Sequence, residues 1–574
     1  MVSLTTWAVP AKPGFVQVTQ SDGTTLQIQT LGDEFCHSLA TADGLMIAQS
    51  VDGDYYYVSA GRVTTMRAHD ADSRSIAEQE FIASHEVQFS KSVMKDGPRR
   101  ARNAAPRRAI SQVPTMGSPR VPIILIEYSD KKMSNSMADF EAQYKTGQKS
   151  VLQYFTDQSN GKYTPQYDLY GIYALDSTRT TYGKNVGQLD KGVALMVTHS
   201  IEKAGDDIDW SQYDNDGDGQ VDVCIVVYAG VGEAQASRTV PWSVWPCQWD
   251  LTEAFVYYND GYGPVTRNGV TIDKFAVFNE IEGSNDLGTT MDGIGTFCHE
   301  FSHCLGLPDF YATNGRYVGM SDWSLMDRGC YNGGRVTGDT PIGYSAYEKA
   351  YMGWIDLITP VENTHYTLSV FNSKSEETDQ AIKLTSPLNE NEYFILENRR
   401  QQGWDLFIPD QGVMISHFTY IPSRWDDNSP NDEMIQLATI MPADNSLNSY
   451  TLDNDLFGRK NHSFTDDTTP AALLNMRASG TLASRTGGAG KLGQPVTGIE
   501  LNADGTASLW YMKIGLTPGD VTGDDAVDVE DVNAIINIIL ELKSASDYPG
   551  DADINGDGKV DVSDVNEEIN IILQ

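Results

Sequence analysis

Positive charge and long apolar runs are scarce in this 574-residue sequence. Lysine and arginine number 41 against 79 aspartate and glutamate residues, which gives a formal net charge of −38. This charge argues against nucleic acid or an anionic membrane as a partner and favours cation binding. No run of 18 apolar residues occurs, so we expect no membrane-spanning helix. The first residues also lack the basic and apolar stretches of a secretory signal, so we expect no signal peptide in this sequence.

Cysteine and histidine are also scarce. The six cysteines are scattered and lack the spacing of a disulfide framework. We interpret them as mostly free or buried thiols, with one pairing among Cys247, Cys298, Cys304 and Cys330 as the alternative. Cysteine usage therefore does not settle the cellular compartment. Histidine occurs only nine times, so two histidines at metal-ligand spacing are informative.

Two of these histidines belong to the pattern HExxHxxGxxD at residues 299–309. On a helix, His299 and His303 share one face and can reach the same metal ion. Glu300 is placed to take a proton from a metal-bound water. The glycine lets the chain turn back, so that Asp309 can supply a third ligand. Two imidazoles and a carboxylate suit one catalytic zinc ion with an open position; a surface helix with coincidental histidines is the alternative.

A methionine downstream of this pattern fits the same site. Residues 323–329 read WSLMDRG and look like a Met-turn, in which Met326 would form an apolar floor beneath the metal. A methionine in a turn is by itself more often ordinary core, but its position after HExxHxxGxxD favours the functional interpretation.

An acidic loop precedes a buried strand in the same region. Asp214, Asp216, Asp218 and Asp222 form the pattern DxDxDGxxD directly before the apolar run 223–228. Alternate carboxylates in a glycine-bent loop direct their oxygens at a hard cation, which predicts about one calcium ion here. The glutamate at position 12 of an EF-hand is absent, so we expect a calcium loop of another kind; a polar turn is the alternative.

The C-terminal tail is an internal repeat in which an acidic loop precedes an apolar helix twice. The EF-like ligand positions 1, 3, 5 and 12 are Asp520, Thr522, Asp524 and Asp531 in the first repeat and Asp553, Asn555, Asp557 and Asp564 in the second. We predict up to two calcium ions, with weaker binding in the first loop because of Thr522 and Asp525. Residues 517–574 hold 15 acidic and 2 basic residues, so bound calcium should stabilise their fold. An acidic disordered tail is the alternative.

The sequence divides into five parts. We expect a small β-rich prodomain at 1–97, an Arg/Pro-rich processing linker at 98–112, a catalytic α/β domain at 113–360, a β-sandwich-like domain at 361–516, and a helical calcium-binding domain at 517–574. The linker has no apolar residues to bury and is basic in an acidic protein, which favours a cleavable joint; a plain solvated linker is the alternative.

Secondary structure within residues 113–360 follows from apolar periodicity. We expect a buried strand from 121, helices at about 136–158 and 188–204, a second buried strand at 223–228, and the metal helix at about 293–306.

Residues from about 113 to 516 resemble the immune inhibitor A family of secreted bacterial zinc metallopeptidases. The matching segments are Val121–Asp130, Val151–Gly161, the acidic loop with its strand and Ala229–Gly230, His299–Tyr311, Ser324–Asp327, Ser345–Trp354 and Phe394–Arg399. The first hundred residues are similar to that family's propeptide, and the tail looks like a type I dockerin.

The resemblance implies a metzincin-like catalytic domain, secretion, and activation from a zymogen. It also implies a cohesin-like partner for residues 517–574, although the tail could instead pack within the molecule. Ser302 and Cys304 stand where the family often has glycine and alanine. No tyrosine follows two residues after Met326, so Tyr331 and Tyr344 are only candidates to polarise the scissile carbonyl.

Together these observations predict an extracellular or cell-surface zinc endopeptidase that acts on proteins or peptides, with Glu300 as general base. The alternative is a non-catalytic scaffold protein that uses its tail and β domain. A separate hypothesis concerns control by the prodomain, in which a thiolate or carboxylate from residues 32–37, such as Cys36, occupies the open position on zinc.

Overall fold

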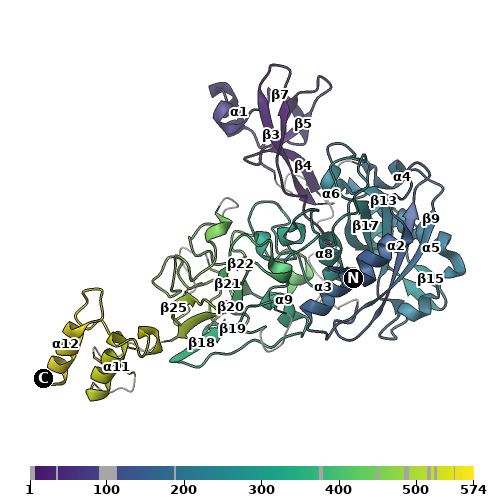
Figure 1. Cartoon of the computed structure of the whole chain (residues 1–574). Coiled ribbons are helices and arrows are strands. Elements are labelled where there is room, and N and C mark those ends of the chain that lie inside the picture. Colours follow the sequence, from purple (N-terminus) through teal and green to yellow (C-terminus); the bar gives the residue numbers. More distant parts are fainter. Residues whose placement is uncertain are drawn as a thin grey trace.

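The structure is a computed structural model that describes residues 7–33, 36–89, 113–186, 189–373, 379–447, 451–483, 490–512, 519–522, 527–548 and 550–573. A small N-terminal body lies above a large α/β body, which continues into a β-rich body and then into a helical tail (Figure 1). The predicted processing linker lies outside the described residues. Among the helices of the described part, none is long and apolar enough to cross a bilayer.

The N-terminal body, purple in Figure 1, is an antiparallel sheet in which strands adjacent in sequence are neighbours in space. Leu26 and Ile28 alternate with polar residues and are buried, and Phe81 of the single helix packs against the same cluster. The elements are β2 (Val16–Thr19), β3 (Thr25–Asp33), β4 (Cys36–Thr41), β5 (Met46–Gln49), β6 (Tyr55–Ser59), β7 (Arg62–Arg67) and α1 (Ile76–Ser84).

The α/β body is built on a mixed sheet with the strand order β1-β14-β17-β13-β8-β9. Its strands are β1 (Trp7–Ala8), β14 (Cys247–Asp250), β17 (Lys274–Ile281), β13 (Cys224–Val231), β8 (Arg120–Glu127) and β9 (Gln166–Ala174). The central strands run parallel and are buried along their length, as expected for strands covered on both faces. On one side of the sheet, β14 pairs antiparallel with β17, and β1, from the start of the chain, pairs antiparallel with β14 and forms the edge.

Two predicted helices differ in extent from the structure. The helix expected at 136–158 is interrupted: α2 (Met137–Glu141) runs into a π-helical turn (Ala142–Thr146), and α3 (Val151–Gln158) begins after a loop. Gly147 ends the first part, and the Ser150 side chain caps the second by accepting the Gln153 N–H. The helix expected at 188–204 is α5 (Val193–Ala204), which starts later because Gly192 precedes it with φ +115°.

The helix α8 (Gly295–Cys304) crosses the body beside β14 and is buried throughout. Its first residue must be glycine, because a Cβ on Gly295 would lie 1.8 Å from the Cys330 carbonyl oxygen. After the helix, Gly306 has φ +101° and turns the chain back.

The β-rich body contains two antiparallel sheets that share an apolar cluster. One sheet holds β19 (Ala381–Thr385), β20 (Glu392–Arg399), β21 (Gly412–Thr419) and β22 (Ala438–Ile440), and the other holds β18 (Thr364–Leu368), β26 (Ala507–Tyr511) and β25 (Val496–Leu501). The opposite face of the first sheet packs on the α/β body, where Phe418 stacks on Tyr347 with ring centroids 3.9 Å apart. The two bodies therefore share one core.

The tail, yellow in Figure 1, consists of α11 (Val529–Ile539) and α12 (Val562–Ile572), which pack against each other. Each begins with a capping box made by an aspartate pair, Asp528 with Asp531 and Asp561 with Asp564.

Candidate active site

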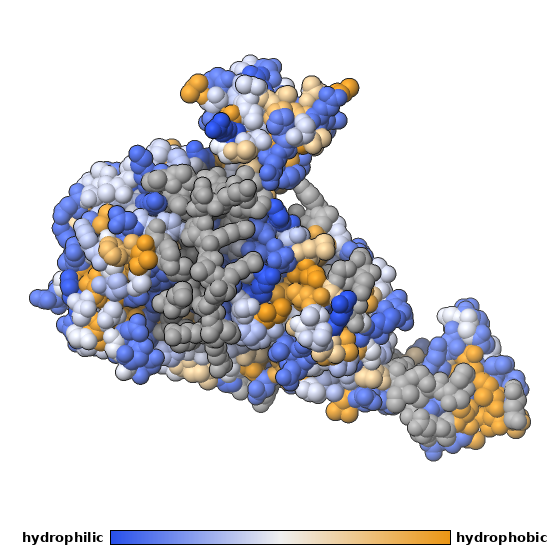
Figure 2. Space-filling model, turned by 180° about the vertical axis from the view of Figure 1, so that it is seen from behind, coloured by the Kyte–Doolittle hydropathy of each residue, from blue (hydrophilic) through white to orange (hydrophobic). Residues whose placement is uncertain are grey.

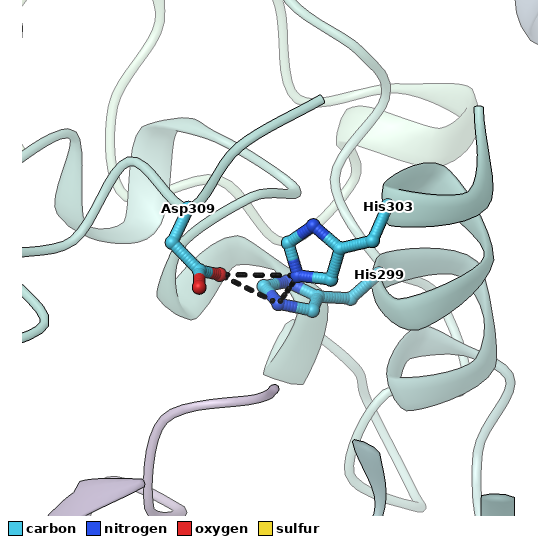
Figure 3. A group of neighbouring side chains, drawn as sticks. All are labelled: His299, His303 and Asp309. Atoms are coloured by element: carbon cyan, nitrogen blue, oxygen red, sulfur yellow. Dashed lines mark hydrogen bonds and ion pairs between the residues drawn. The ribbon is translucent and has the colours of Figure 1, made fainter. Parts of the chain in front are cut away.

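Three side chains from α8 and the turn after it converge at one point, as Figure 3 shows. Asp309 Oδ1 lies 3.1 Å from His299 Nε2 and 3.2 Å from His303 Nε2, and the two Nε2 atoms are 3.1 Å apart. Ligand atoms about 2.0–2.1 Å from a tetrahedral zinc ion lie roughly 3.3 Å from one another. The observed spacing is close to that value, so the three atoms can share one ion.

Each of the three side chains is oriented by a hydrogen bond to an atom other than the one that faces the shared point. The Nδ1–H groups of His299 and His303 donate to the carbonyl oxygens of Leu325 and Leu307, both at 2.8 Å. These bonds leave both Nε2 lone pairs free for a metal. Asn428 holds the carboxylate: its Nδ2–H donates to Asp309 Oδ2 at 2.6 Å, and its Oδ1 accepts the Asp309 N–H at 2.8 Å.

The donor set fits zinc. Apart from the two imidazoles, the buried Asp309 Oδ1 has no hydrogen-bond partner among the described residues. A buried carboxylate oxygen directed at two imidazole nitrogens needs a cation or shared protons. Burial opposes ionisation of Asp309, but the two imidazoles outweigh it and hold its pKa below the usual value.

Glu300 lies beside this group and is fully buried. Burial, and then the negative charge of Asp309, raise the pKa of Glu300 well above its usual value. Its Oε1 accepts the backbone N–H of Val9 at 2.5 Å. A carboxyl group with a raised pKa can exchange a proton with a neighbouring atom near neutral pH.

The first described residues therefore occupy the site. Trp7 and Ala8 pair antiparallel with Gln248 and Cys247 of β14. Beyond them, the Trp245 indole N–H donates to the Val9 carbonyl at 3.1 Å, and the Tyr331 hydroxyl donates to the Pro10 carbonyl at 2.6 Å. An extended segment crosses the metal group as an added strand.

Comparison with known proteins agrees with this geometry. The family described as immune inhibitor A peptidase M6, catalytic domain, matches residues 126–354, and the dockerin type I domain matches residues 518–573. Residues 126–354 are a peptidase M6 domain. Immune inhibitor A of Bacillus thuringiensis subsp. alesti is 25% identical over 288 residues, which cover 40% of this chain and 39% of that protein.

A second relative of the M6 domain is a Vibrio cholerae protein. Pre-pro-metalloprotease PrtV of serotype O1 is 24% identical over 272 residues, which cover 42% of this chain and 28% of that protein. The matched region thus spans well under half the length of each of these relatives.

Three further predicted residues of the M6 domain lie near α8. Met326 is fully buried and follows Leu325, whose carbonyl orients His299. Of the two tyrosine candidates, Tyr331 reaches the N-terminal segment in the site. Tyr344 is buried in the core and its hydroxyl bonds to Ser302, so only Tyr331 is placed to contact a bound peptide.

The acidic loop of the M6 domain brings three of its four predicted ligands together. Carboxylate oxygens of Asp214, Asp216 and Asp218 lie within 4.8 Å of one another. Asp222 is not a member of this group, because its carboxylate accepts both the backbone N–H and the side-chain amide of Asn215. Burial raises the pKa of Asp222 to about 7.

The described parts of the two dockerin loops share one contact. The position-12 residues Asp531 and Asp564 are buried and accept the position-3 N–H groups of Thr522 and Asn555, at 2.7 and 3.2 Å. In the second loop, Asp553 accepts the N–H groups of Asp557 and Gly558. Asp520 is buried. Asp524 lies outside the described residues, and neither loop has three carboxylates within 4.8 Å in the described part.

Three residues that make contacts around the site could not be identified from the sequence. Val9 and Asn428 belong to no recognisable motif. Trp245 precedes β14, and the role of that strand depends on the fold. Of residues 32–37, which we expected to block zinc, His37 stacks on Trp245 and pairs with Glu233 at 3.3 Å. Glu34, Phe35 and the side chain of Cys36 lie outside the described part, so the role expected of Cys36 stays a prediction. The segment that contacts Glu300 belongs to residues 7–12. Cys224, Cys298, Cys304 and Cys330 are buried free thiols, and Cys247 is buried as well.

Proposed function

We propose that this protein is a secreted zinc endopeptidase made as a zymogen. The observation that carries the proposal is the group His299, His303 and Asp309 beside Glu300 in an M6 domain. Zinc in this group would supply Lewis acidity that activates water and polarises the peptide carbonyl. The PrtV relative is a metalloprotease by name. The alternative, a non-catalytic scaffold protein, is not favoured because a scaffold does not require two histidines, an aspartate and a glutamate in this arrangement.

The individual residues would then have the following roles in catalysis. Glu300 takes a proton from the attacking water at its carboxylate and hands it to the leaving nitrogen. The contact of the Val9 N–H with Oε1 supports this role, because it brings a backbone amide nitrogen within hydrogen-bond reach of the Glu300 carboxyl group. Tyr331 donates a hydrogen bond to a backbone carbonyl in the same cleft, which suits it to stabilise developing oxyanion charge.

Substrates would bind as β1 does, by adding an extended strand to the edge of β14 that β1 occupies in this structure. Backbone hydrogen bonds of this kind select an extended peptide and impose little side-chain preference. The class of substrate that follows is an unfolded or loop segment of a protein.

The same contacts support latency. Residues 7–12 fill the edge and cover Glu300, while Ala11 N–H donates to the Gly32 carbonyl and so joins the segment to the prodomain sheet. Cleavage in the Arg/Pro-rich linker would remove the covalent connection between the prodomain and the M6 domain, after which the segment can dissociate. The name of the PrtV relative, a pre-pro-metalloprotease, agrees with such a precursor.

Calcium would serve two parts of the chain. One ion at Asp214, Asp216 and Asp218 would fix the loop before β13, and up to two ions would order the dockerin loops. The dockerin domain also exposes apolar side chains, including Leu540, Ile569 and Leu573, and Figure 2 shows apolar residues gathered on the tail. This surface suits a cohesin-like partner outside the cell.

The test is proteolysis by the trimmed chain. Protein lacking residues 1–108 should cleave casein, and Glu300→Gln or removal of zinc should abolish cleavage while circular dichroism shows an intact fold. Re-addition of zinc should restore the activity of the chelated wild-type protein only. Undiminished cleavage by the Glu300→Gln variant would refute the assignment.

A further inference from the structure

A buried carboxylate in the tail is not explained by the predicted calcium loops. Glu568 lies on α12 and is fully buried, and neither of its carboxylate oxygens has a hydrogen-bond partner among the residues that the structure describes. An ionised carboxylate is costly to bury without a partner. The Glu568 carboxylate therefore needs either a bound cation or a proton at this buried position.

Glu568 belongs to the second repeat but faces the loop of the first. A Cβ built on Gly519 would lie 2.9 Å from Glu568 Oε1 and 3.0 Å from Oε2, and Gly519 immediately precedes the first ligand position, Asp520. Burial raises the pKa of Glu568 to about 7, and the charges of Asp531 and Asp520 add to the effect. The carboxylate of Glu568, from the second repeat, thus lies next to the start of the first loop.

The internal repeat shows that this arrangement is specific to the first loop. The equivalent of Glu568 on α11 is Ile535, which is buried in the apolar core of the tail. The two loops also differ at ligand position 3, which is Asn555 in the second loop but Thr522 in the first. The Thr522 hydroxyl is buried and has no hydrogen-bond partner in the described part of the chain, which excludes residues 523–526. The loop with the poorer oxygen donor of its own is the one that a glutamate approaches from the other helix.

We propose that Glu568 is a calcium ligand of the first dockerin loop and completes, with Asp520 and Asp531, a site shared between the two repeats. Calcium accepts six to eight oxygen ligands, so a carboxylate from a neighbouring helix can join the loop's own donors. The inference rests on the proposed calcium binding of the tail and extends it. It also makes the packing of α12 on α11 depend on the ion in the first loop.

The experiment is hydrogen–deuterium exchange with mass spectrometry on the full chain, titrated with calcium in the inactive Glu300→Gln background. Peptides spanning residues 519–535 report the first loop, and peptides spanning 553–564 report the second. Glu568→Gln should raise the half-saturating calcium concentration of the first loop at least tenfold and change that of the second less than twofold. The matched control is Glu567→Gln, which removes an exposed charge from the same helix and should change neither loop by twofold.

Several results would overturn the assignment. An unchanged first loop in Glu568→Gln, or equal shifts in both loops, would show that Glu568 carries a proton or serves only packing. If Glu568→Gln does not fold in saturating calcium, Glu568→Asp replaces it and should give the same loop-specific loss. Absence of calcium-dependent protection in both wild-type loops would refute calcium binding by the tail as well, whereas a calcium-dependent second loop beside an insensitive first loop would refute this proposal alone.

Discussion

Asn428 and Asp309 are joined by two hydrogen bonds, although 119 residues separate them and they belong to different bodies of the fold. The amide of Asn428 fixes both the carboxylate and the backbone of the proposed third zinc ligand. The β-rich body therefore contributes to orienting the proposed zinc ligands through its packing on the M6 domain.

We expect Asn428→Ala to weaken zinc binding by about 10–100-fold, the usual effect of losing a residue that orients a metal ligand. The measurement is competition with a chromogenic chelator on the trimmed chain. Asn391→Ala is the control, because Asn391 is exposed on the same body. Equal affinities of the Asn428→Ala and control variants would show that Asp309 does not need this support.

Tyr331 and Tyr344 form a matched pair for testing oxyanion stabilisation. We expect Tyr331→Phe to lower kcat by about 100-fold with little change in KM, as for loss of one oxyanion donor. Tyr344→Phe removes a hydroxyl that contacts Ser302 in the core and should change thermal stability rather than kcat. Steady-state kinetics on a quenched fluorescent peptide separate the two, and similar kcat losses in both would exclude a special role for Tyr331.

The N–H of Val9 offers a direct test of latency. Val9→Pro removes this donor to Glu300, and leaving a buried acceptor such as Glu300 Oε1 without its hydrogen bond costs about 1–3 kcal/mol. We therefore expect the uncut chain to gain about tenfold in basal peptidase activity. The assay follows peptide cleavage while gel electrophoresis confirms that the chain remains intact.

Phe15→Pro is the control for Val9→Pro, because Phe15 is exposed and lies beyond the segment that crosses the site. It should leave basal activity unchanged. A similar gain in both variants would indicate general loosening of the prodomain instead of loss of the contact with Glu300.

The ion pair of His37 with Glu233 predicts that prodomain docking depends on pH. Burial alone would lower the pKa of His37, but the hydrogen bond and charge of Glu233 outweigh it and raise the pKa above 6.5. The charged form is favoured in the docked state, so its contribution is complete below pH 6.5 and is lost as the pH rises through the raised pKa. Exchange protection of β4 should fall over that range in the wild type but not in His37→Gln. Equal pH profiles, after correction for intrinsic exchange, would contradict this.

The helix that carries His299 and His303 could be predicted from the sequence because the residues that define it lie close together in the chain. The four-residue spacing of His299 and His303 and the later glycine fix which side chains face the metal. The interruption at Gly147 and the late start after Gly192 are also encoded locally in the sequence. The expected helix boundaries differed from the structure because they were based on apolar periodicity and did not take these glycines into account. Contacts such as Val9 with Glu300 or Asn428 with Asp309 depend on chain segments that meet only in the folded state. Glu568 is an intermediate case, since comparison of the two repeats shows a glutamate where the other helix has isoleucine.

The loop before β13 gives the last prediction, which concerns calcium and stability. At a calcium concentration 100 times the dissociation constant, binding adds about 2.7 kcal/mol to the free energy of unfolding. For a domain of this size that corresponds to a rise of about 5–10 °C in Tm. The double variant Asp216→Asn, Asp218→Asn should lose this rise for the M6 transition while retaining the zinc content of the wild type. Asp176→Ala, an exposed acidic residue of the same domain, should keep it. Calorimetry on the Glu300→Gln background avoids self-cleavage, and a full calcium-dependent rise in the double variant would place the ion elsewhere.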